Sequence, residues 1–154
     1  MDVLRLLSLF AALLMTGLMA GLYFAFSTSV LPGIGRRDDN TFVDSMRAMN
    51  SAILNPLFLL MFMGPVPLGL VAVATRLGEG HRAGLCWATT GLVLYVVTLV
   101  ITGVVNVPLN NRLDSTEPPE AARAVFEQRW VEWNAVRTVM CTAALAAFAL
   151  ALVN

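Results

Sequence analysis

Lysine is absent from this chain, and charged residues of any kind are scarce. The 10 basic residues are all arginine, the acidic residues also number 10, and charged residues make up 13% of the 154 positions. A soluble domain usually carries about a quarter charged residues, so the composition argues against a soluble fold. The net charge of zero provides no strongly basic surface, and we predict no nucleic-acid partner.

Histidine and cysteine are equally sparse. His81 is the single histidine, and the two cysteines, Cys86 and Cys141, lie near the start of the third apolar segment and inside the fourth. A protein-bound zinc, haem or iron–sulfur cluster needs such ligands gathered at one point. The sequence therefore predicts no metal and no cofactor, and we interpret both thiols as small buried apolar groups.

Long apolar runs are what the chain has in abundance. Hydrophobic residues make up 58% of it, and the mean hydropathy is +0.74. Four segments reach the roughly 20 apolar residues that one helical crossing of a bilayer needs: about 4–31, 56–74, 85–105 and 134–153. Because backbone groups find no water in lipid, such segments must be helical. We predict one all-α membrane domain over residues 1–154, a four-transmembrane-helix bundle in the cell (inner) membrane.

The two longer connections resemble each other, and a two-plus-two internal repeat is one interpretation. The chain leaves the first span through "STSVLPGIG" and the third through "VVNVPLNNRLD". An amphipathic interfacial helix over about residues 40–53 follows the first stretch. After the second stretch we expect an interfacial helix that runs on unbroken into the fourth span. In this alignment Asn50 and Asn134 occupy equivalent places.

Several local signals suggest where helices begin, bend and end. Proline lacks the N–H that a helix interior needs, so we expect Pro108 to end the helix of the third span. Pro65 and Pro67 predict a kink in the second span. Ser115 or Thr116 is the expected cap of the last helix.

Polar side chains recur at helical spacing inside three of the spans. The sets are Thr16, Tyr23 and Ser27, then Tyr95, Thr98, Thr102 and Asn106, then Trp130, Asn134 and Arg137. Lipid offers their hydrogen-bonding groups no partner, so we expect these faces to point inward. Interhelical hydrogen bonds are a sufficient explanation for the threonines. An amide or a charge near the membrane edge costs more and indicates function, and Glu127 or Glu132 is the expected partner of Arg137.

We therefore expect a polar pocket at the end of the bundle that carries the longer connections. Its candidate residues are Tyr23, Asn50, Asn106, Asn110, Arg112, Trp130, Trp133, Asn134 and Arg137. Amides offer donors and acceptors, and arginine offers a fixed positive charge. The alternative is that Asn106 and Asn110 only cap the end of a helix, and that Arg137 only extends its charge to the interface.

Four stretches occur in a characteristic order: "VLPGI", "MRAMNSAILNP", "NVPLNNRLD" and "WVEWNAVRT". Together they resemble the anthrone-oxygenase-like family of small four-span membrane proteins, many of whose bacterial members are classed as a domain of unknown function. The resemblance covers nearly the whole chain. It implies oxidation of anthrones to anthraquinones by molecular oxygen, without a metal or an organic cofactor.

The resemblance also implies roles for the candidate residues. Trp130 and Trp133 would offer aromatic surface to a flat substrate. The oxyanion that develops on the substrate would be held by Arg137 or Arg112 together with the catalytic amides Asn106 and Asn134.

The sequence provides no obvious general base. His81 lies on the short connection at the opposite end of the bundle, so a carboxylate such as Asp114 or Glu132 would have to serve. The alternative to an enzyme is a non-catalytic membrane protein that binds a lipid, a quinone or a partner protein. The sequence leaves both an enzyme and a binding protein open, and both a monomer and a homo-oligomer.

Overall fold

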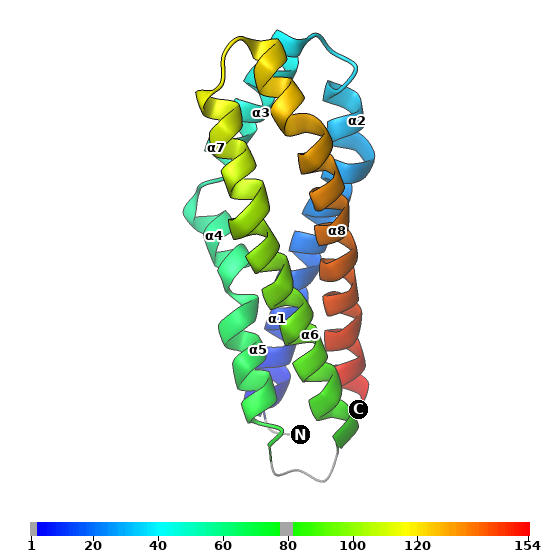
Figure 1. The fold of residues 1–154 in the computed structure, drawn as a ribbon. Coiled ribbons are helices and arrows are strands. Elements are labelled where there is room, and N and C mark those ends of the chain that lie inside the picture. Colours follow the sequence, from blue (N-terminus) through cyan, green and yellow to red (C-terminus); the bar gives the residue numbers. More distant parts are fainter. Residues whose placement is uncertain (1–2, 78–81) are drawn as a thin grey trace.

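The computed structural model describes residues 3–77 and 82–154, and the secondary structure within these ranges is helical without strands (Figure 1). One helical column comprises α1 (Val3–Ala25), the π-helical turn η1 (Phe26–Val30) and α2 (Leu31–Ile34), and α3 (Asp39–Ala52) follows it. The second comprises α4 (Pro56–Met63) and α5 (Pro65–Ala74). The third comprises α6 (Arg82–Ile101), the π-helical turn η2 (Thr102–Asn106) and α7 (Val107–Ser115). The fourth is α8 (Pro119–Val153).

The four columns are each long and apolar enough to cross a membrane, as the sequence predicted. The 19 residues of Pro56–Ala74 rise about 28 Å at about 1.5 Å per residue, which matches a hydrocarbon layer roughly 30 Å thick. The other three columns are longer, at 32, 34 and 35 residues. From this length we place one boundary of the hydrocarbon layer at the start of α4. The protein is a multi-pass membrane protein with a four-helix bundle.

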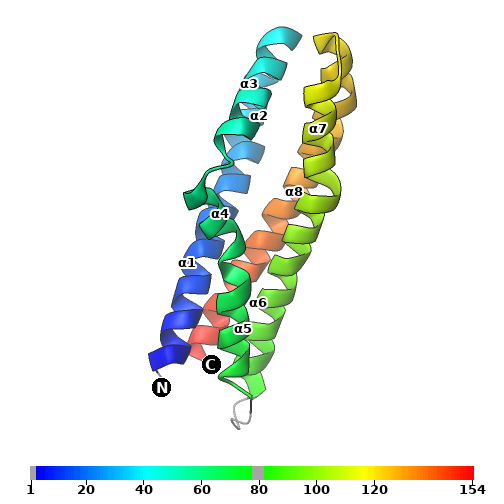
Figure 2. The same ribbon diagram turned by 90° about the vertical axis from the view of Figure 1, so that its left-hand side faces the viewer.

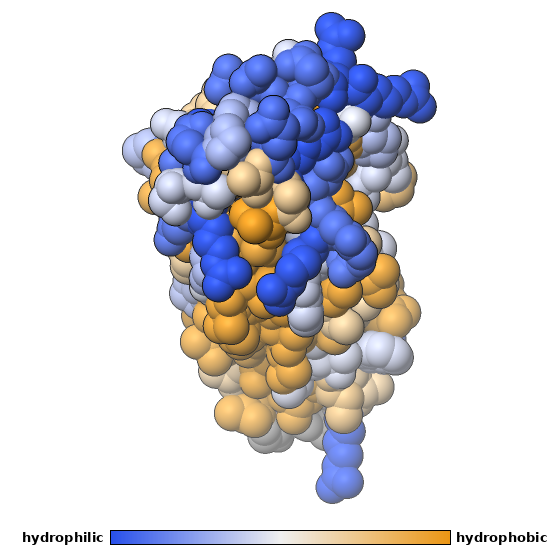
Figure 3. All heavy atoms as spheres, turned by 45° about the horizontal axis from the view of Figure 1, so that its top comes forward, coloured by the Kyte–Doolittle hydropathy of each residue, from blue (hydrophilic) through white to orange (hydrophobic). Residues whose placement is uncertain are grey.

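The polar cap, as we call it, consists of α2, α3, α7 and the first turns of α8. It combines the separate helix α3 with the parts of the longer helices that extend past this boundary. They gather at one end of the bundle, and both chain termini lie at the other (Figures 1 and 2). Hydrophilic side chains cover this end, and hydrophobic surface lies below it (Figure 3). Inside the cap, α3 buries Phe42, Val43 and Met46.

Neither proline of the longer connections ends its helix. Pro32 and Pro108 each follow a π-helical turn, η1 and η2, by two residues. Proline leaves a backbone carbonyl without its usual donor, and a π turn is one way in which a helix absorbs such a gap. The expectation that Pro108 ends the third helix was therefore wrong, because the helix continues to Ser115.

The start of α3 has a side-chain cap, whereas the start of α8 differs from expectation. Asp38 begins α3 by accepting hydrogen bonds from the Thr41 backbone N–H (3.0 Å) and hydroxyl (2.7 Å), and these bonds hold the pKa of Asp38 below its usual value. Ser115 and Thr116 do not cap α8. Their hydroxyls donate to the Arg112 carbonyl and so close α7. The second span divides into α4 and α5 at Gly64, directly before Pro65, but Gly64 keeps helical φ and ψ angles of −56° and −38°, so the kink expected at Pro65 and Pro67 stays a prediction.

An arginine from the first half of the chain braces the end of α7. Arg47 on α3 donates to the Leu113 carbonyl from Nη2 (2.8 Å) and Nε (3.2 Å), and to the Thr116 carbonyl (3.1 Å). It also pairs with the Glu117 carboxylate at 3.1 Å. The last carbonyls of a helix lack intrahelical donors, so this side chain supplies what α7 leaves unpaired.

An arginine from the second half braces the end of α2 in the same manner. Arg123 on α8 donates to the Gly35 carbonyl (2.7 Å) and the Arg37 carbonyl (2.9 Å). It pairs with Asp39 at 3.0 Å and Glu127 at 2.6 Å. Each half of the chain therefore completes the helix end of the other half.

These features recur at one interval along the chain. The same spacing separates Phe26 from Thr102, Pro32 from Pro108 and Arg47 from Arg123, which are the π turns, the prolines and the bracing arginines. The pattern supports a two-plus-two internal repeat with both halves running in the same direction. It aligns Asn50 with Phe126, so the expected pairing of Asn50 with Asn134 was wrong.

Replacing Arg123 by methionine is expected to lower the stability of the cap. The carbonyls of Gly35 and Arg37 and the carboxylate of Asp39 lose their donor, at a cost of about 1–3 kcal/mol. Thermal unfolding of the purified protein in detergent would show this as a lower Tm. Arg129→Met is the matched control, because Arg129 is an exposed arginine on the same helix. An equal fall in Tm for both variants would contradict the bracing role.

Candidate functional site: a polar pocket below the cap

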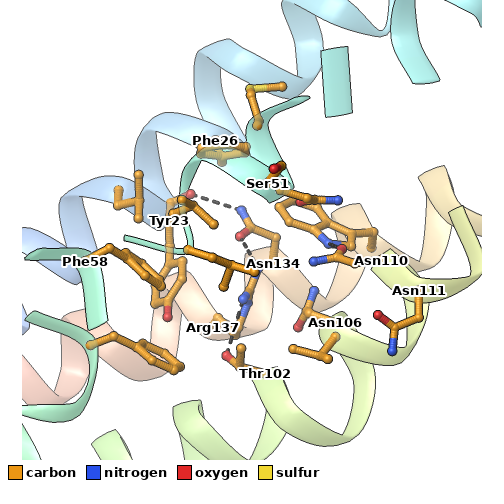
Figure 4. A pocket seen from close by; sticks show the side chains of 18 of the residues that line it. Tyr23, Phe26, Ser51, Phe58, Thr102, Asn106, Asn110, Asn111, Asn134 and Arg137 are labelled. Carbon is orange, nitrogen blue, oxygen red and sulfur yellow. Dashed lines mark hydrogen bonds between the residues drawn. The ribbon is translucent and has the colours of Figure 1, made fainter. Parts of the chain in front are cut away.

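A cavity of about 430 Å³ lies where the cap meets the membrane-spanning bundle. Its walls come from the top of α1, the end of α3, the start of α4, the region from η2 to α7, and the middle of α8 (Figure 4). Phe26, Phe58 and Phe62 supply apolar wall. The volume is in the range of small-molecule sites, which combine an apolar lining with a few placed polar groups.

Arg137 is the most unusual polar group of this cavity. Its guanidinium carbon lies 4.6 Å from the ring centre of Tyr23 and 5.2 Å from that of Trp130. Nη2 donates to Asn134 Oδ1 (2.8 Å) and Nη1 donates to Thr102 Oγ1 (3.3 Å). The residue is 5% exposed, so the polar stripes meet at a buried cation sandwiched between aromatic rings.

No described carboxylate forms an ion pair with Arg137. The expected partners are engaged elsewhere, since Glu127 pairs with Arg123 and Glu132 accepts a bond from Gln128. That expectation was wrong because both carboxylates point toward the cap, away from the buried segment of α8. A buried cation without a counter-charge is costly, and an anionic or electron-rich ligand would offset that cost.

Asn134 is fully buried, and both polar atoms of its side chain have protein partners. Nδ2 donates to the Tyr23 carbonyl (3.0 Å) and to Ser27 Oγ (2.8 Å), while Oδ1 accepts from Arg137. The residue therefore ties α8 to α1 and aims the guanidinium of Arg137. This geometry makes Asn134 a positioning residue.

Asn106 has the opposite character. It is 1% exposed and lines the cavity at the end of η2, yet neither its amide nitrogen nor its amide oxygen has a partner among the described residues. Asn50 Nδ2 and Arg137 Nε are likewise buried without a partner. Each unpaired buried group costs about 1–3 kcal/mol. Asn106 and Arg137 lie near each other in the cavity wall (Figure 4), and both carry buried polar atoms without a described partner.

The two asparagines should respond differently to substitution. Asn134→Leu is expected to destabilise the protein by about 1–3 kcal/mol, because the Tyr23 carbonyl and Arg137 lose their partner. Asn106→Leu is expected to leave stability unchanged or to raise it, because it removes a buried group without partners. Thermal unfolding of the two variants in detergent compares them directly. A lower Tm for Asn106→Leu than for Asn134→Leu would contradict these assignments.

Aromatic rings and Asn110 form the wall next to Arg137. Trp130 Nε1 donates to Asn110 Oδ1 at 2.8 Å. The Trp130 ring lies 5.8 Å from the rings of both Phe26 and Phe126. The alternative that Asn106 and Asn110 cap the broken end of a helix does not hold. The helix is unbroken there, and α7 has no side-chain cap at its start.

The cavity contains most of the residues expected from the sequence, but not all. Tyr23, Asn50, Asn106, Asn110, Trp130, Asn134 and Arg137 line it, whereas Arg112 and Trp133 do not. Arg112 was wrong as a pocket residue, because it lies on a different face of α7 from the lining residues. Trp133 lies three positions after Trp130, near the lining face of α8, and still does not line the cavity. Of the proposed bases, Asp114 lines the cavity at its exposed rim, Glu132 does not, and His81 lies outside the described residues.

Among the charged and amide side chains of the lining, Arg47 and Asn111 were not expected. Arg47 lies three positions before Asn50 on one amphipathic helix, which places both on the same face. That spacing was the available signal. Asn111 follows Asn110 directly, and no helix was expected there to indicate its direction.

The sequence profile of the anthrone oxygenase family matches residues 58–147. No curated protein and no solved structure matches the chain. The matched stretch covers more than half of the chain and includes, among other cavity residues, Asn106, Trp130, Asn134 and Arg137. By this match, the chain belongs to the anthrone oxygenase family.

Proposed function

We propose that this protein is a cofactor-independent oxygenase of the cell (inner) membrane that converts a flat, anthrone-like aromatic molecule to the quinone. The observation that carries the proposal is the buried Arg137, which has no described carboxylate partner and lies beside the unpaired amide of Asn106. Such donors, fixed in a water-poor site, suit an oxygen atom on which negative charge develops. Family membership supports the reaction class.

The chemistry begins with loss of a proton from the central methylene of the substrate. The resulting enolate carries its charge on oxygen, where Arg137 and Asn106 stabilise it. Asp114 is the described carboxylate that lines the cavity, and we assign it the role of general base. Trp130, Phe26 and Phe58 supply the apolar and aromatic surface against which the rings of the substrate pack.

The electron-rich enolate then reacts with molecular oxygen, which is the oxidant. At the reacting carbon, two C–H bonds break and a C=O group forms with one atom of O₂. The other oxygen atom leaves as water with the two hydrogens. One O₂ is consumed for each quinone formed, and no external reductant is needed.

Anthrone turnover by the purified protein in lipid nanodiscs tests the proposal. Under ¹⁸O₂ and with a chelator present, we expect anthraquinone to form faster than in empty nanodiscs, with one ¹⁸O atom incorporated and one O₂ consumed per product. Formation at the rate of empty nanodiscs would reject the oxygenase and remove this substrate class.

A second candidate function is binding of a quinone or lipid without turnover. The observation that favours it is the exposed position of Asp114, which leaves the buried part of the cavity without a described carboxylate. In that case the donors of Arg137 and Asn106 would hold a ligand carbonyl. Saturable binding of anthraquinone without anthrone turnover would distinguish this candidate from the oxygenase.

A further inference from the structure

Three apolar residues that line the cavity also lie on the outer surface of the bundle. Leu54 is 71% exposed, Leu59 on α4 is 44% exposed and Val107 on α7 is 44% exposed. A side chain that lines a cavity and faces outward marks an opening. This opening lies between the start of α4 and α7, which stand on opposite sides in Figure 2, as Phe58 and Asn111 do in Figure 4.

The lower edge of the opening is at the level of lipid. Helix α4 begins at Pro56, close to the boundary of the hydrocarbon layer, so Leu59 lies about one turn inside that boundary. Its neighbours Leu57 and Leu60 are 69% and 55% exposed, which is usual for side chains that face lipid tails. The upper edge is polar, because Arg47, Asn111 and Asp114 line the cavity there.

The upper edge of the opening is exposed as well, at Ser51, Asn111 and Asp114, but the cap gives no path through its own interior. A cluster of buried apolar side chains fills it, including Phe42, Met46, Leu113 and Phe126. The braces of Arg47 and Arg123 hold the surrounding helix ends together. Reaching the cavity from above would require this packed cluster to separate.

We propose that the ligand enters and leaves this pocket sideways from the bilayer, between α4 and α7, with Leu59 and Val107 as gate residues. The proposal rests on the pocket assigned under the proposed function and adds the route to it. It specifies the ligand class as a flat aromatic molecule that dissolves in the membrane and carries an oxygen at one edge. The apolar lower edge admits its rings, while the donors of Arg137 and Asn106 lie deeper in the pocket.

Anthraquinone binding kinetics test the route separately from turnover. In a Trp87→Phe, Trp133→Phe background, Trp130 in the cavity wall is the one remaining tryptophan. Its fluorescence, quenched by anthraquinone, reports binding in nanodiscs. The gate variant is Leu59→Phe with Val107→Phe. Its matched control is Leu60→Phe with Val100→Phe, which adds equal bulk at exposed positions on α4 and α6 that do not line the cavity.

We expect the gate variant to bind and release anthraquinone about tenfold more slowly while its Kd changes by less than about twofold, because a narrowed route slows both directions equally. The control should behave as the parent does. In the parent, adding lipid at a constant total amount of anthraquinone lowers the mole fraction of anthraquinone in the lipid. The association rate should fall in proportion to that mole fraction.

Two results would overturn the route but not the assignment of the pocket. One is that the gate variant binds and releases anthraquinone at the parental rates. The other is that its Kd changes because only the dissociation rate changes. Absence of any quenching would overturn the route and the pocket together.

Discussion

Replacing Arg137 by methionine is expected to lower the rate of anthrone oxidation by about 10²–10³-fold, the usual effect of removing one donor to a developing oxyanion. Methionine keeps similar length and packing between the rings of Tyr23 and Trp130 but carries neither the charge nor the N–H groups. The loss should appear in kcat and kcat/KM alike, because the charge of the enolate is largest in the transition state.

Stability separates this role from a structural one. Arg137→Met leaves Asn134 Oδ1 without its donor, which costs about 1–3 kcal/mol, but it also removes a buried charge without a described carboxylate partner, so its Tm should fall no further than that of Asn134→Leu. Arg137→Lys keeps a charge but loses the planar fork, and its rate should fall between those of the parent and the methionine variant. A large fall in Tm together with the loss of rate would assign Arg137 to the fold.

Asp114→Asn is expected to lower kcat by about 10²-fold or more, which is typical of the loss of a general base. The amide has nearly the same size but does not take up the methylene proton of the substrate. Asp114 is exposed and forms no ion pair among the described residues, so the fold should not depend on its charge.

Glu132→Gln is the matched control, because Glu132 is an exposed carboxylate that does not line the cavity. Its turnover should equal that of the parent. Activity retained in Asp114→Asn would remove the carboxylate from the mechanism and favour bases in the solvent or on the substrate itself.

Apolar runs and helical spacing predicted much of this fold. At the end of the bundle opposite the cap, the predicted limits of the four spans agree with the structure within a few residues. The reason is that a long apolar segment in lipid must be helical. The same constraint turned Thr98, Asn134 and Arg137 inward. The polar faces of the third and fourth spans therefore pack against each other, and the sequence predicted the pocket at the end of the bundle that carries the longer connections.

Local backbone chemistry was harder to predict. Pro108 looks like a helix end in sequence, yet a π turn before it lets the helix continue, and nothing in "TGVVN" distinguishes a π turn from an α turn. Arg47 lies on the predicted amphipathic helix, but its bonds to Leu113 and Thr116 depend on how distant segments pack. Trp133 was expected in the pocket because it lies three positions after Trp130, a spacing that keeps both near one helical face, yet it does not line the cavity.

The spectrum of the Asn106 side-chain amide tests the central claim most directly. With ¹⁵N-labelled asparagine, its signal can be assigned by Asn106→Gln. The exposed Asn154, whose amide donates to the Leu150 carbonyl, provides an internal reference. The account predicts that saturating anthraquinone shifts the Asn106 signal and leaves the Asn154 signal in place, because the ligand oxygen takes up the unpaired donor. An unchanged Asn106 signal while anthraquinone binds would place the ligand elsewhere and contradict the account.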